Sequence, residues 1–319
     1  MPTALITGVS GQDGTYLSEL LVSKGYRVVG LTRDVAAARS GRFAGSMEGV
    51  ELLESHLASV PDTIELLNGV RPDEVYHLAG PSRVSASWDD PAGTVAGIVT
   101  TTAVLLDGLR GAASRARLFT AGSCEIFASQ DHGQDESAPR RPDSPYGTAK
   151  LRAHDLVEAG RDRDGLFAVT GILFNHDSPR RDESFVSRKI TRGAARIARG
   201  EGRDLRLGNL RVRRDWGFAG DYVRAMWMML QQDAPEDLVI GTGTAHSVAD
   251  FCEVAFAAVG LGWADHVVSD PVLFRPADAP LRLADPGRAR RRLGWSPEVD
   301  FHGLVSMMVA HEMGAGSGD

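Results

Sequence analysis

A tyrosine and a lysine stand four residues apart in the segment Ser144-Pro145-Tyr146-Gly147-Thr148-Ala149-Lys150. On a helix this spacing places both side chains on one face, one turn apart. A phenol has an ordinary pKa of about 10, and a neighbouring positive charge favours its ionised form. We therefore expect Tyr146 and Lys150 to act together as a base that removes a proton from a hydroxyl group.

Glycines at every third position of the N-terminal segment predict a site for a dinucleotide. Gly8, Gly11 and Gly14 follow an expected strand and open an expected helix, with Gln12 and Asp13 between the last two glycines. Glycines permit the tight turn and let backbone N–H groups approach a pyrophosphate at the helix N-terminus. The alternative is an ordinary turn between a strand and a helix.

The residue at the end of the second expected strand bears on the choice of cofactor. Folds that prefer NAD usually carry an acidic residue there, whereas this chain has Arg33, which could contact a 2′-phosphate. Asp34 follows at once and would oppose that contact. The sequence favours NADP, with NAD as the alternative, and Arg33 could also be an exposed loop cation.

Ser123 and Glu125 follow another expected strand and could complete a catalytic group. The Ser123 hydroxyl could hydrogen-bond the substrate oxygen that Tyr146 deprotonates. Oxidation at C4 of a sugar needs only serine, tyrosine and lysine. Loss of water across C5 and C6 also needs a group that removes the C5 proton and protonates the leaving hydroxyl, which a carboxyl can do. The alternative is that Glu125 is a solvated carboxylate, and Cys124 is expected to be a small apolar neighbour.

Alternating strand and helix patterns must position these residues. In the first half of the chain the patterns predict strands at Thr3–Thr7, Tyr26–Leu31, Glu74–Leu78, Arg117–Ala121 and Phe167–Phe174. Helices are expected at Tyr16–Ser23, Ile64–Val70, Thr94–Leu109 and Tyr146–Gly160. This alternation is typical of an α/β protein with a Rossmann-type, doubly wound parallel sheet.

The second half predicts a smaller, mixed α/β C-terminal domain over the carboxyl ends of the strands. Asn175–Arg214 is arginine-rich and is interpreted as irregular, while Asp221–Leu230 and Val248–Val259 are expected to be helices. The predicted division is 1–174 with 213–246 for the dinucleotide domain and 175–212 with 247–319 for the substrate domain.

Bulk properties exclude several classes of protein. The 319 residues are 43% hydrophobic and 24% charged, a balance typical of globular proteins. The net charge of −7 argues against a generic nucleic-acid binder. Cys124 and Cys252 cannot form a disulfide framework, and no cysteine and histidine spacing indicates a metal site. No signal peptide or membrane span is expected, so we predict a cytoplasmic protein.

Longer segments resemble the GDP-mannose 4,6-dehydratase family of extended short-chain dehydrogenases/reductases over nearly the whole chain. The resembling segments are Ala4–Gly8, Gly11–Gly14, Arg71–Ala79, Gly171–Arg181, Phe185–Ile190, Leu207–Leu210, Arg214–Gly217, Asp221–Val223, Met226–Trp227, Thr244–Val248 and Arg275–Pro276.

The resemblance implies a role for individual residues. The implied catalytic residues are Ser123, Glu125, Tyr146 and Lys150. The implied cofactor contacts are Gly8, Gly11, Gln12, Asp13, Gly14, Arg33, Leu78, Ala79, Tyr146, Lys150, His176 and Arg181. The implied substrate contacts are Ser82, Asn175, Val186, Lys189, Arg214, Arg275 and Asp278. Arginines suit this last task because they make charge-assisted, forked bonds to diphosphate oxygens.

The chain also departs from the family pattern, mostly on the side expected to hold adenine. The departures are Asp34 for arginine, His56 for aspartate, Gly93 for tyrosine, Pro81 and Arg83 for glutamine and histidine, Asp278 for glutamate, and a shorter loop between 33 and 51. These differences leave open the preference for NADP, the family's tetramer and the exact substrate.

The resemblance implies a lyase that converts GDP-mannose, or a close sugar nucleotide, to its 4-keto-6-deoxy derivative. The steps would be oxidation at C4, loss of water across C5 and C6, and return of the hydride to C6. A nucleotide-sugar epimerase or 4-ketoreductase is the alternative within enzymes, and a non-catalytic NAD(P)-binding sensor is the alternative outside them. The expected partners are a GDP-sugar and a second copy of the chain, with a homodimer preferred to a tetramer and neither nucleic acid nor membrane involved.

Overall fold

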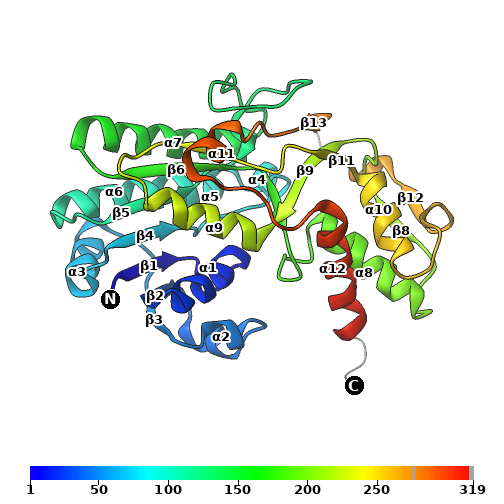
Figure 1. The fold of residues 1–319 in the computed structure, drawn as a ribbon, viewed down its shortest axis with the longest axis horizontal. Helices are drawn as coiled ribbons and strands as arrows, with labels where there is room; N and C mark the ends of the chain where they lie inside the picture. Colours follow the sequence, from blue (N-terminus) through cyan, green and yellow to red (C-terminus); the bar gives the residue numbers. More distant parts are fainter. Residues whose placement is uncertain (275–276, 316–319) are drawn as a thin grey trace.

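A seven-stranded parallel sheet with strand order β10-β6-β5-β4-β1-β2-β3 forms the centre of the molecule (Figure 1). The structure is a computed structural model and describes residues 1–274 and 277–315. The strands of the sheet are β1 (Thr3–Thr7), β2 (Arg27–Thr32), β3 (Val50–Glu54), β4 (Glu74–His77), β5 (Arg117–Ala121), β6 (Ala168–Leu173) and β10 (Leu238–Ile240). The predicted doubly wound sheet is confirmed, and its order reverses between β1 and β4, where such sheets bind ligands.

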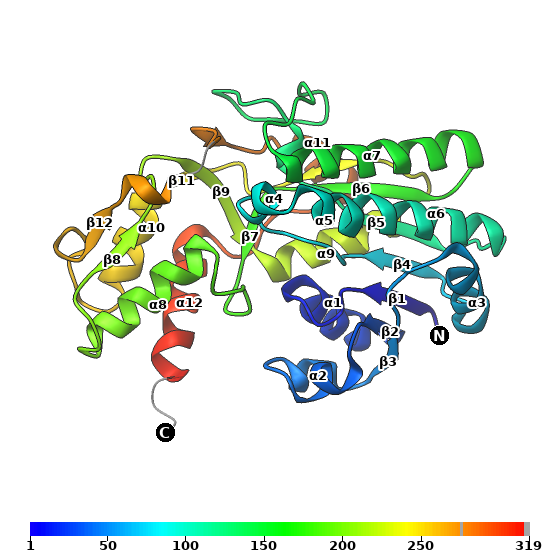
Figure 2. The ribbon, with the colours of Figure 1, turned by 180° about the vertical axis from the view of Figure 1, so that it is seen from behind.

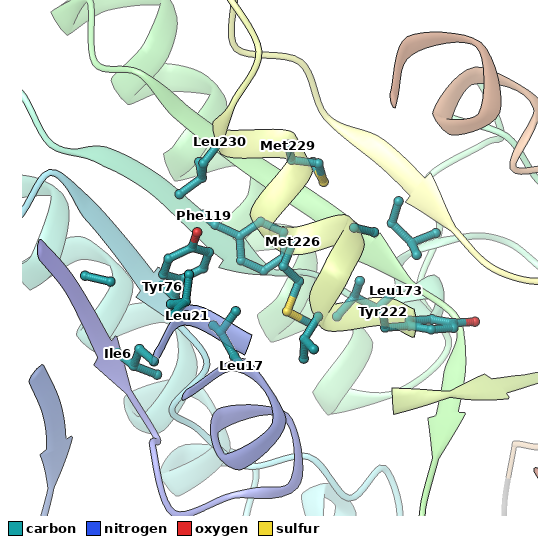
Figure 3. Close-up of a cluster of buried hydrophobic side chains, with 14 of the residues drawn as sticks. Ile6, Leu17, Leu21, Tyr76, Phe119, Leu173, Tyr222, Met226, Met229 and Leu230 are labelled. Carbon is teal, nitrogen blue, oxygen red and sulfur yellow. The ribbon is translucent and has the colours of Figure 1, made fainter. Parts of the chain in front are cut away.

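Helices cover both faces of this sheet because neighbouring residues of each strand point to opposite sides. Ile6 packs in one core with α1 (Gln12–Ser23) and α9 (Ala219–Leu230), around Tyr76 and Phe119 (Figure 3). Leu5, the preceding residue, packs in the core on the other face. The helices of that face are α3 (Val60–Val70), α6 (Thr101–Gly111) and α7 (Pro145–Asp164).

The helix expected at Thr94–Leu109 is a longer, interrupted run. It consists of α5 (Pro91–Val95), a π-helical turn η2 (Ala96–Thr100) and α6. By length and composition alone, Pro91–Gly111 could also cross a membrane. In the structure this run lies beside α7 in the layer of helices seen in Figure 2.

A second lobe lies at the carboxyl ends of the sheet strands (Figure 1). Its strands are β7 (Asn175–Asp177), β9 (Arg213–Phe218), β11 (Ala245–Ser247) and β13 (Leu281–Arg282) in one sheet, and β8 (Leu205–Leu207) with β12 (Val267–Ser269) in another. Its main helices are α8 (Val186–Ala198), α10 (Val248–Ala257) and α12 (Phe301–Ala315). Trp216, Phe251 and Phe301 contact one another in its core.

The structure differs from the sequence prediction in the arginine-rich segment Asn175–Arg214. This segment contains the 13-residue helix α8, whose residues Ile190, Ala194 and Ile197 are buried together against the second core. The arginines occupy other positions of the helix and obscure the apolar spacing. β9 also pairs with strands of the second lobe, so we propose the two-domain division with 213–218 moved to the substrate domain.

Three further α-helices are short. They are α2 (Val35–Ser40), α4 (Ala86–Asp89) and α11 (Gly287–Leu293).

Candidate active site

A cleft of about 380 Å³ lies between the two lobes, where β4, β5 and β6 end. A volume of this size is typical of a small-molecule site. The cleft brings together many of the residues predicted from the sequence. Those that line it are Asp13, Leu78, Ser82, Ser123, Glu125, Tyr146, Lys150, Asn175, His176, Arg181, Val186, Lys189, Arg214 and Asp278.

The predicted tyrosine and lysine lie near the start of α7. The Ser144 side chain caps this helix by accepting the N–H of Gly147 at 3.0 Å. The Lys150 Nζ lies 5.8 Å from the centre of the Tyr146 ring, as expected for residues one turn apart. The same Nζ donates to the carbonyl oxygen of Ala121 at 2.7 Å, which holds the ammonium at the end of β5.

Burial dominates the ionisation of this pair. Burial raises the pKa of the Tyr146 phenol well above its usual value, although a hydrogen bond with Ser123 opposes the rise. Burial also lowers the pKa of Lys150 to about 8, while Asp13 raises it. Further positive charge must therefore be present before Tyr146 ionises readily near neutral pH.

Ser123 and Glu125 lie beside this pair, after β5. Ser123 is the N-cap of a short 3₁₀ turn (η3, Cys124–Ile126), and Glu125 lies within the turn. The Ser123 Oγ accepts the backbone N–H of Glu125 at 3.2 Å, which fixes the turn. Burial raises the pKa of the Cys124 thiol to about 12, so this cysteine is a poor nucleophile. The turn thus presents one hydroxyl and one carboxylate to the cleft.

Sequence reasoning missed Arg282, which contacts the predicted carboxylate. The Arg282 Nη2 donates to the Glu125 Oε2 at 3.1 Å, and its Nη1 donates to the Phe127 carbonyl oxygen at 3.0 Å. The guanidinium is buried. Its partner lies 157 residues earlier in the chain, so no local pattern could have indicated this contact.

The glycines of the N-terminal loop let its backbone pack closely against neighbouring backbone. Gly8 has a φ of +71°, and a Cβ added there would lie 2.9 Å from the Ala79 backbone. A Cβ on Gly14 would lie 2.4 Å from the Gly8 carbonyl oxygen. Gly11 precedes α1 and supplies no side-chain cap, so N–H groups of the first turn remain available. This arrangement fits a pyrophosphate.

Two residues of the glycine loop bind the strand that leads into the second lobe. The Asp13 carboxylate lies 2.9 Å from the His176 Nε2, and the Gln12 Nε2 donates to the His176 carbonyl oxygen at 3.1 Å. Burial alone would lower the pKa of His176, but Asp13 raises it above its usual value. The pair therefore favours a charged histidine, whose ring also stacks on Tyr222 at 4.6 Å.

The predicted diphosphate contacts lie on the opposite wall. Arg214 is buried, donates to the Ala279 carbonyl oxygen at 2.8 Å and pairs with Asp278 at 2.5 Å. Lys189 extends from α8 to the same cleft. Asp278 therefore holds an arginine in the structure. The predicted Arg275 lies outside the described residues.

The residues that bear on cofactor choice lie at the end of β2. Arg33 is exposed there and does not line the cleft. Five other predicted cofactor contacts also do not line it, namely Gly8, Gly11, Gln12, Gly14 and Ala79. The Asp34 side chain accepts the N–H of Ala37 at 2.8 Å and caps α2. The negative charge of Asp34, which was expected to oppose a phosphate, thus interacts with the N-terminus of α2.

Among the described residues, His154, Glu158 and Asp237 have ligand atoms close enough to share a metal ion. Arg140 pairs with Glu158 at 2.9 Å, and Arg161 pairs with Asp237 at 3.0 Å. These arginines balance both carboxylates, so the cluster needs no ion. It ties α7 to the end of the sheet.

Comparisons with known proteins agree on one family. The family described as GDP-mannose 4,6 dehydratase matches residues 5–308. GDP-mannose 4,6 dehydratase 2 of Arabidopsis thaliana is 43% identical, covering 97% of this chain and 86% of the relative. GDP-mannose 4,6 dehydratase of Homo sapiens is 39% identical, covering 96% of this chain and 90% of the relative.

Solved structures establish the fold. UDP-glucose 4-epimerase of Thermotoga maritima with UDP-glucose has a TM-score of 0.87 at 22% identity, covering 98% of this chain and 99% of that one. The Thermus thermophilus UDP-glucose 4-epimerase complex with NAD has a TM-score of 0.86 at 23% identity, with coverages of 98% and 99%. RMD of Pseudomonas aeruginosa complexed with NADPH has a TM-score of 0.79 at 20% identity, with coverages of 99% and 100%.

Proposed function

This chain belongs to the GDP-mannose 4,6-dehydratase family, and from that premise we propose that it converts GDP-mannose, or a close sugar nucleotide, to the 4-keto-6-deoxy derivative. The observation that carries the proposal is the meeting of Ser123, Glu125 and Tyr146 in one cleft. Oxidation at C4 alone would not require the carboxylate, whereas loss of water does.

A nicotinamide dinucleotide fits the glycine cradle, and when bound it supplies a reversible acceptor for the hydride of C4. Gly8, Gly11 and Gly14 would hold its pyrophosphate against the start of α1. We propose NADP as the physiological form because Arg33 is exposed and Asp34 is engaged as a helix cap. Solved relatives of the fold hold either NAD or NADPH, so NAD remains the alternative.

Each catalytic side chain then has one task. Ser123 hydrogen-bonds the C4 oxygen and Tyr146 removes its proton, with Lys150 stabilising the phenolate. The C4 ketone makes the C5 proton acidic. Glu125 removes this proton and protonates the C6 hydroxyl, which leaves as water.

The opposite wall would hold the nucleotide diphosphate. Lys189 and Arg214 supply positive charge there, and arginine forms forked bonds to phosphate oxygens. Ser82, Asn175, Val186 and Asp278 line the same cleft, and Arg275 belongs to this proposed set.

We further propose a cytoplasmic homodimer, with a tetramer as the alternative. The run α5–η2–α6 lies beside α7 on one side of the molecule (Figure 2). Residues along this run are apolar but only partly buried, as expected for a surface that a second copy would cover.

The product mass after incubation with GDP-mannose tests this function. We expect loss of one water with no net reduction of added NADP, because the hydride returns to the sugar. An unchanged mass with altered stereochemistry would favour the epimerase alternative. Tight cofactor binding with no turnover of any sugar nucleotide would favour the sensor.

A further inference from the structure

Arg282 is a buried arginine to which the proposed reaction assigns no task. Its side chain is 1% exposed, and its Nη2 lies 3.1 Å from the Glu125 carboxylate and 3.4 Å from the Asp143 carboxylate. A buried guanidinium is costly unless it is paired and hydrogen-bonded. Here two carboxylates and the Phe127 carbonyl oxygen share it.

The contact with Arg282 leaves one oxygen atom of the Glu125 carboxylate available. Arg282 binds only the Oε2 atom. The Oε1 atom has no hydrogen bond within residues 1–274 and 277–315, and Glu125 lines the cleft. The guanidinium therefore holds the carboxylate through one oxygen while the other oxygen can meet a substrate.

We propose that Arg282 is a positioning residue that holds the Glu125 carboxylate in the orientation needed for proton transfer at C5 and C6. The proposal rests on the proposed dehydratase function. A charge-assisted hydrogen bond is among the strong hydrogen bonds of a protein. The bond to Oε2 therefore fixes the carboxylate and leaves Oε1 at a defined place in the cleft.

The atoms balance over one turnover. A hydride leaves C4 and the C4 hydroxyl proton passes to Tyr146. Glu125 takes the C5 proton and returns it to the C6 oxygen, the C6–O bond breaks, and water leaves as a double bond forms between C5 and C6. The hydride then adds to C6. The proton that C5 finally gains balances the one that left the C4 hydroxyl, and Glu125 ends as a carboxylate.

The strand that carries Arg282 also serves the diphosphate side of the cleft. Arg282 in β13 lies in register with Arg214 in β9, and Asp278, four residues before Arg282, pairs with Arg214. The N–H of Ala284 donates to the buried Asp215 at 3.2 Å and fixes the end of the strand. One short segment thus positions a residue of the proposed substrate site and the proposed proton-transfer carboxylate.

Other groups near the carboxylate do not replace Arg282. They are Asp143, Cys124 and Tyr146. Burial raises the pKa of both Cys124 and Tyr146, and neither side chain can supply a positive charge to Glu125. Among the described residues, Arg282 is the cation that hydrogen-bonds Glu125, and Asp143 accepts from the same guanidinium.

Arg282→Met, which removes the charge, and Arg282→Lys, which keeps it, test the proposal. In single turnovers with GDP-mannose, reduction of the bound nicotinamide reports C4 oxidation and product mass reports dehydration. We expect Arg282→Met to oxidise C4 at nearly the wild-type rate, but to dehydrate about 100-fold more slowly. Arg282→Lys, which keeps a charged hydrogen-bond donor, should restore the ratio of the two rates.

Arg161→Met is the matched control, because it also breaks an arginine–carboxylate pair. Arg161 lies near the C-terminal end of α7 and pairs with Asp237. Arg161→Met should lower the melting temperature without altering the ratio of the two rates. Arg282→Gln serves if Arg282→Met does not fold. This variant keeps hydrogen-bond donors but removes the charge, and it should also slow dehydration relative to C4 oxidation.

An unchanged dehydration rate in folded Arg282→Met would overturn the proposal, as would an unchanged ratio of the two rates in Arg282→Gln if Arg282→Met does not fold. Wild-type protein that forms no water-loss product would instead overturn the dehydratase function, and the role of Arg282 with it. The two failures are distinguishable because only the second appears in the wild type.

Discussion

At the scale of single residues, burial pushes the reactive groups towards their neutral forms. It raises the pKa of Tyr146, raises that of Cys124 to about 12 and lowers that of Lys150 to about 8. A group buried in low dielectric loses the solvation of its charged form. The site therefore depends on charges supplied by neighbours and by bound ligands.

Glu125→Gln should separate the two halves of the reaction. An amide keeps the size of the carboxylate but cannot accept a proton at C5. We expect C4 oxidation to continue and dehydration to fall by about 100-fold or more. Nicotinamide absorbance and product mass, measured on the same sample, give both rates. Full dehydration by this variant would contradict the role assigned to Glu125.

The lowered pKa of Lys150 predicts an alkaline limb. A lysine whose pKa lies near 8 loses its charge as the pH rises through that value, and the phenolate then loses its positive neighbour. We expect kcat/KM to fall above about pH 8, because this constant reports the free enzyme.

Lys150→Arg is the companion variant, since a guanidinium stays charged across this range. Its plateau should be lower because the forked group fits the site less well, but its alkaline limb should lie at higher pH. An alkaline limb at the same pH in both proteins would mean that another group titrates there.

At the scale of elements, helix N-termini and strand ends place the chemistry. α7 begins with the Ser144 cap, presents Tyr146 and Lys150 in its first two turns, and is tied at its other end by Arg161 and Asp237. α1 begins at glycines that leave backbone N–H groups uncovered.

Gly14→Ala should damage the cofactor cradle. Its Cβ would lie 2.4 Å from the Gly8 carbonyl oxygen and 2.6 Å from that of Val9, so the loop must shift. We expect cofactor affinity, measured by calorimetry, to fall at least about tenfold, and stability to fall by about 1–3 kcal/mol, the usual cost of overpacking.

Gly69→Ala is the matched control. Gly69 lies inside α3, and a Cβ there would meet nothing within 4 Å. This change should leave cofactor affinity unchanged and raise stability by roughly 0.5–1 kcal/mol, because alanine loses less backbone entropy on folding. Equal cofactor affinities for the two variants would remove the argument for a close-fitting cradle.

At the scale of the whole molecule, bonds between the lobes define the site. Asp13 binds His176 across the start of the second lobe, and Arg282 crosses from β13 to Glu125. The cofactor loop and the proposed proton-transfer carboxylate are each joined to the lobe that would hold the sugar nucleotide. A movement that opens the cleft would therefore disturb both the cofactor loop and the Glu125 carboxylate.

The proposed dimer gives a prediction at this scale. Val99 and Ala103, one turn apart in the run η2–α6, are both partly exposed. We expect sedimentation to give twice the chain mass for the wild type and a shift towards the monomer for Ala103→Glu, because a buried unpaired charge is costly at an interface. A dimer of unchanged affinity in this variant would place the interface elsewhere.

The sequence by itself determined the features that depend on neighbouring residues. The four-residue spacing of Tyr146 and Lys150 and the glycine loop before α1 follow from helix geometry and backbone freedom, and alternating patterns predicted the parallel sheet. The same local signal was available for α8, because Ile190, Ala194 and Ile197 share one face, but arginines between them led to the wrong interpretation.

Only the tertiary structure decided which distant groups meet. The contacts of Arg282 with Glu125 and of His176 with Asp13 join residues 157 and 163 positions apart. The pairing of β9 with the second lobe likewise depends on how Trp216 packs against Phe251 and Phe301. Such contacts depend on how strands and helices from distant parts of the chain pack together. No short segment of the chain contains that information.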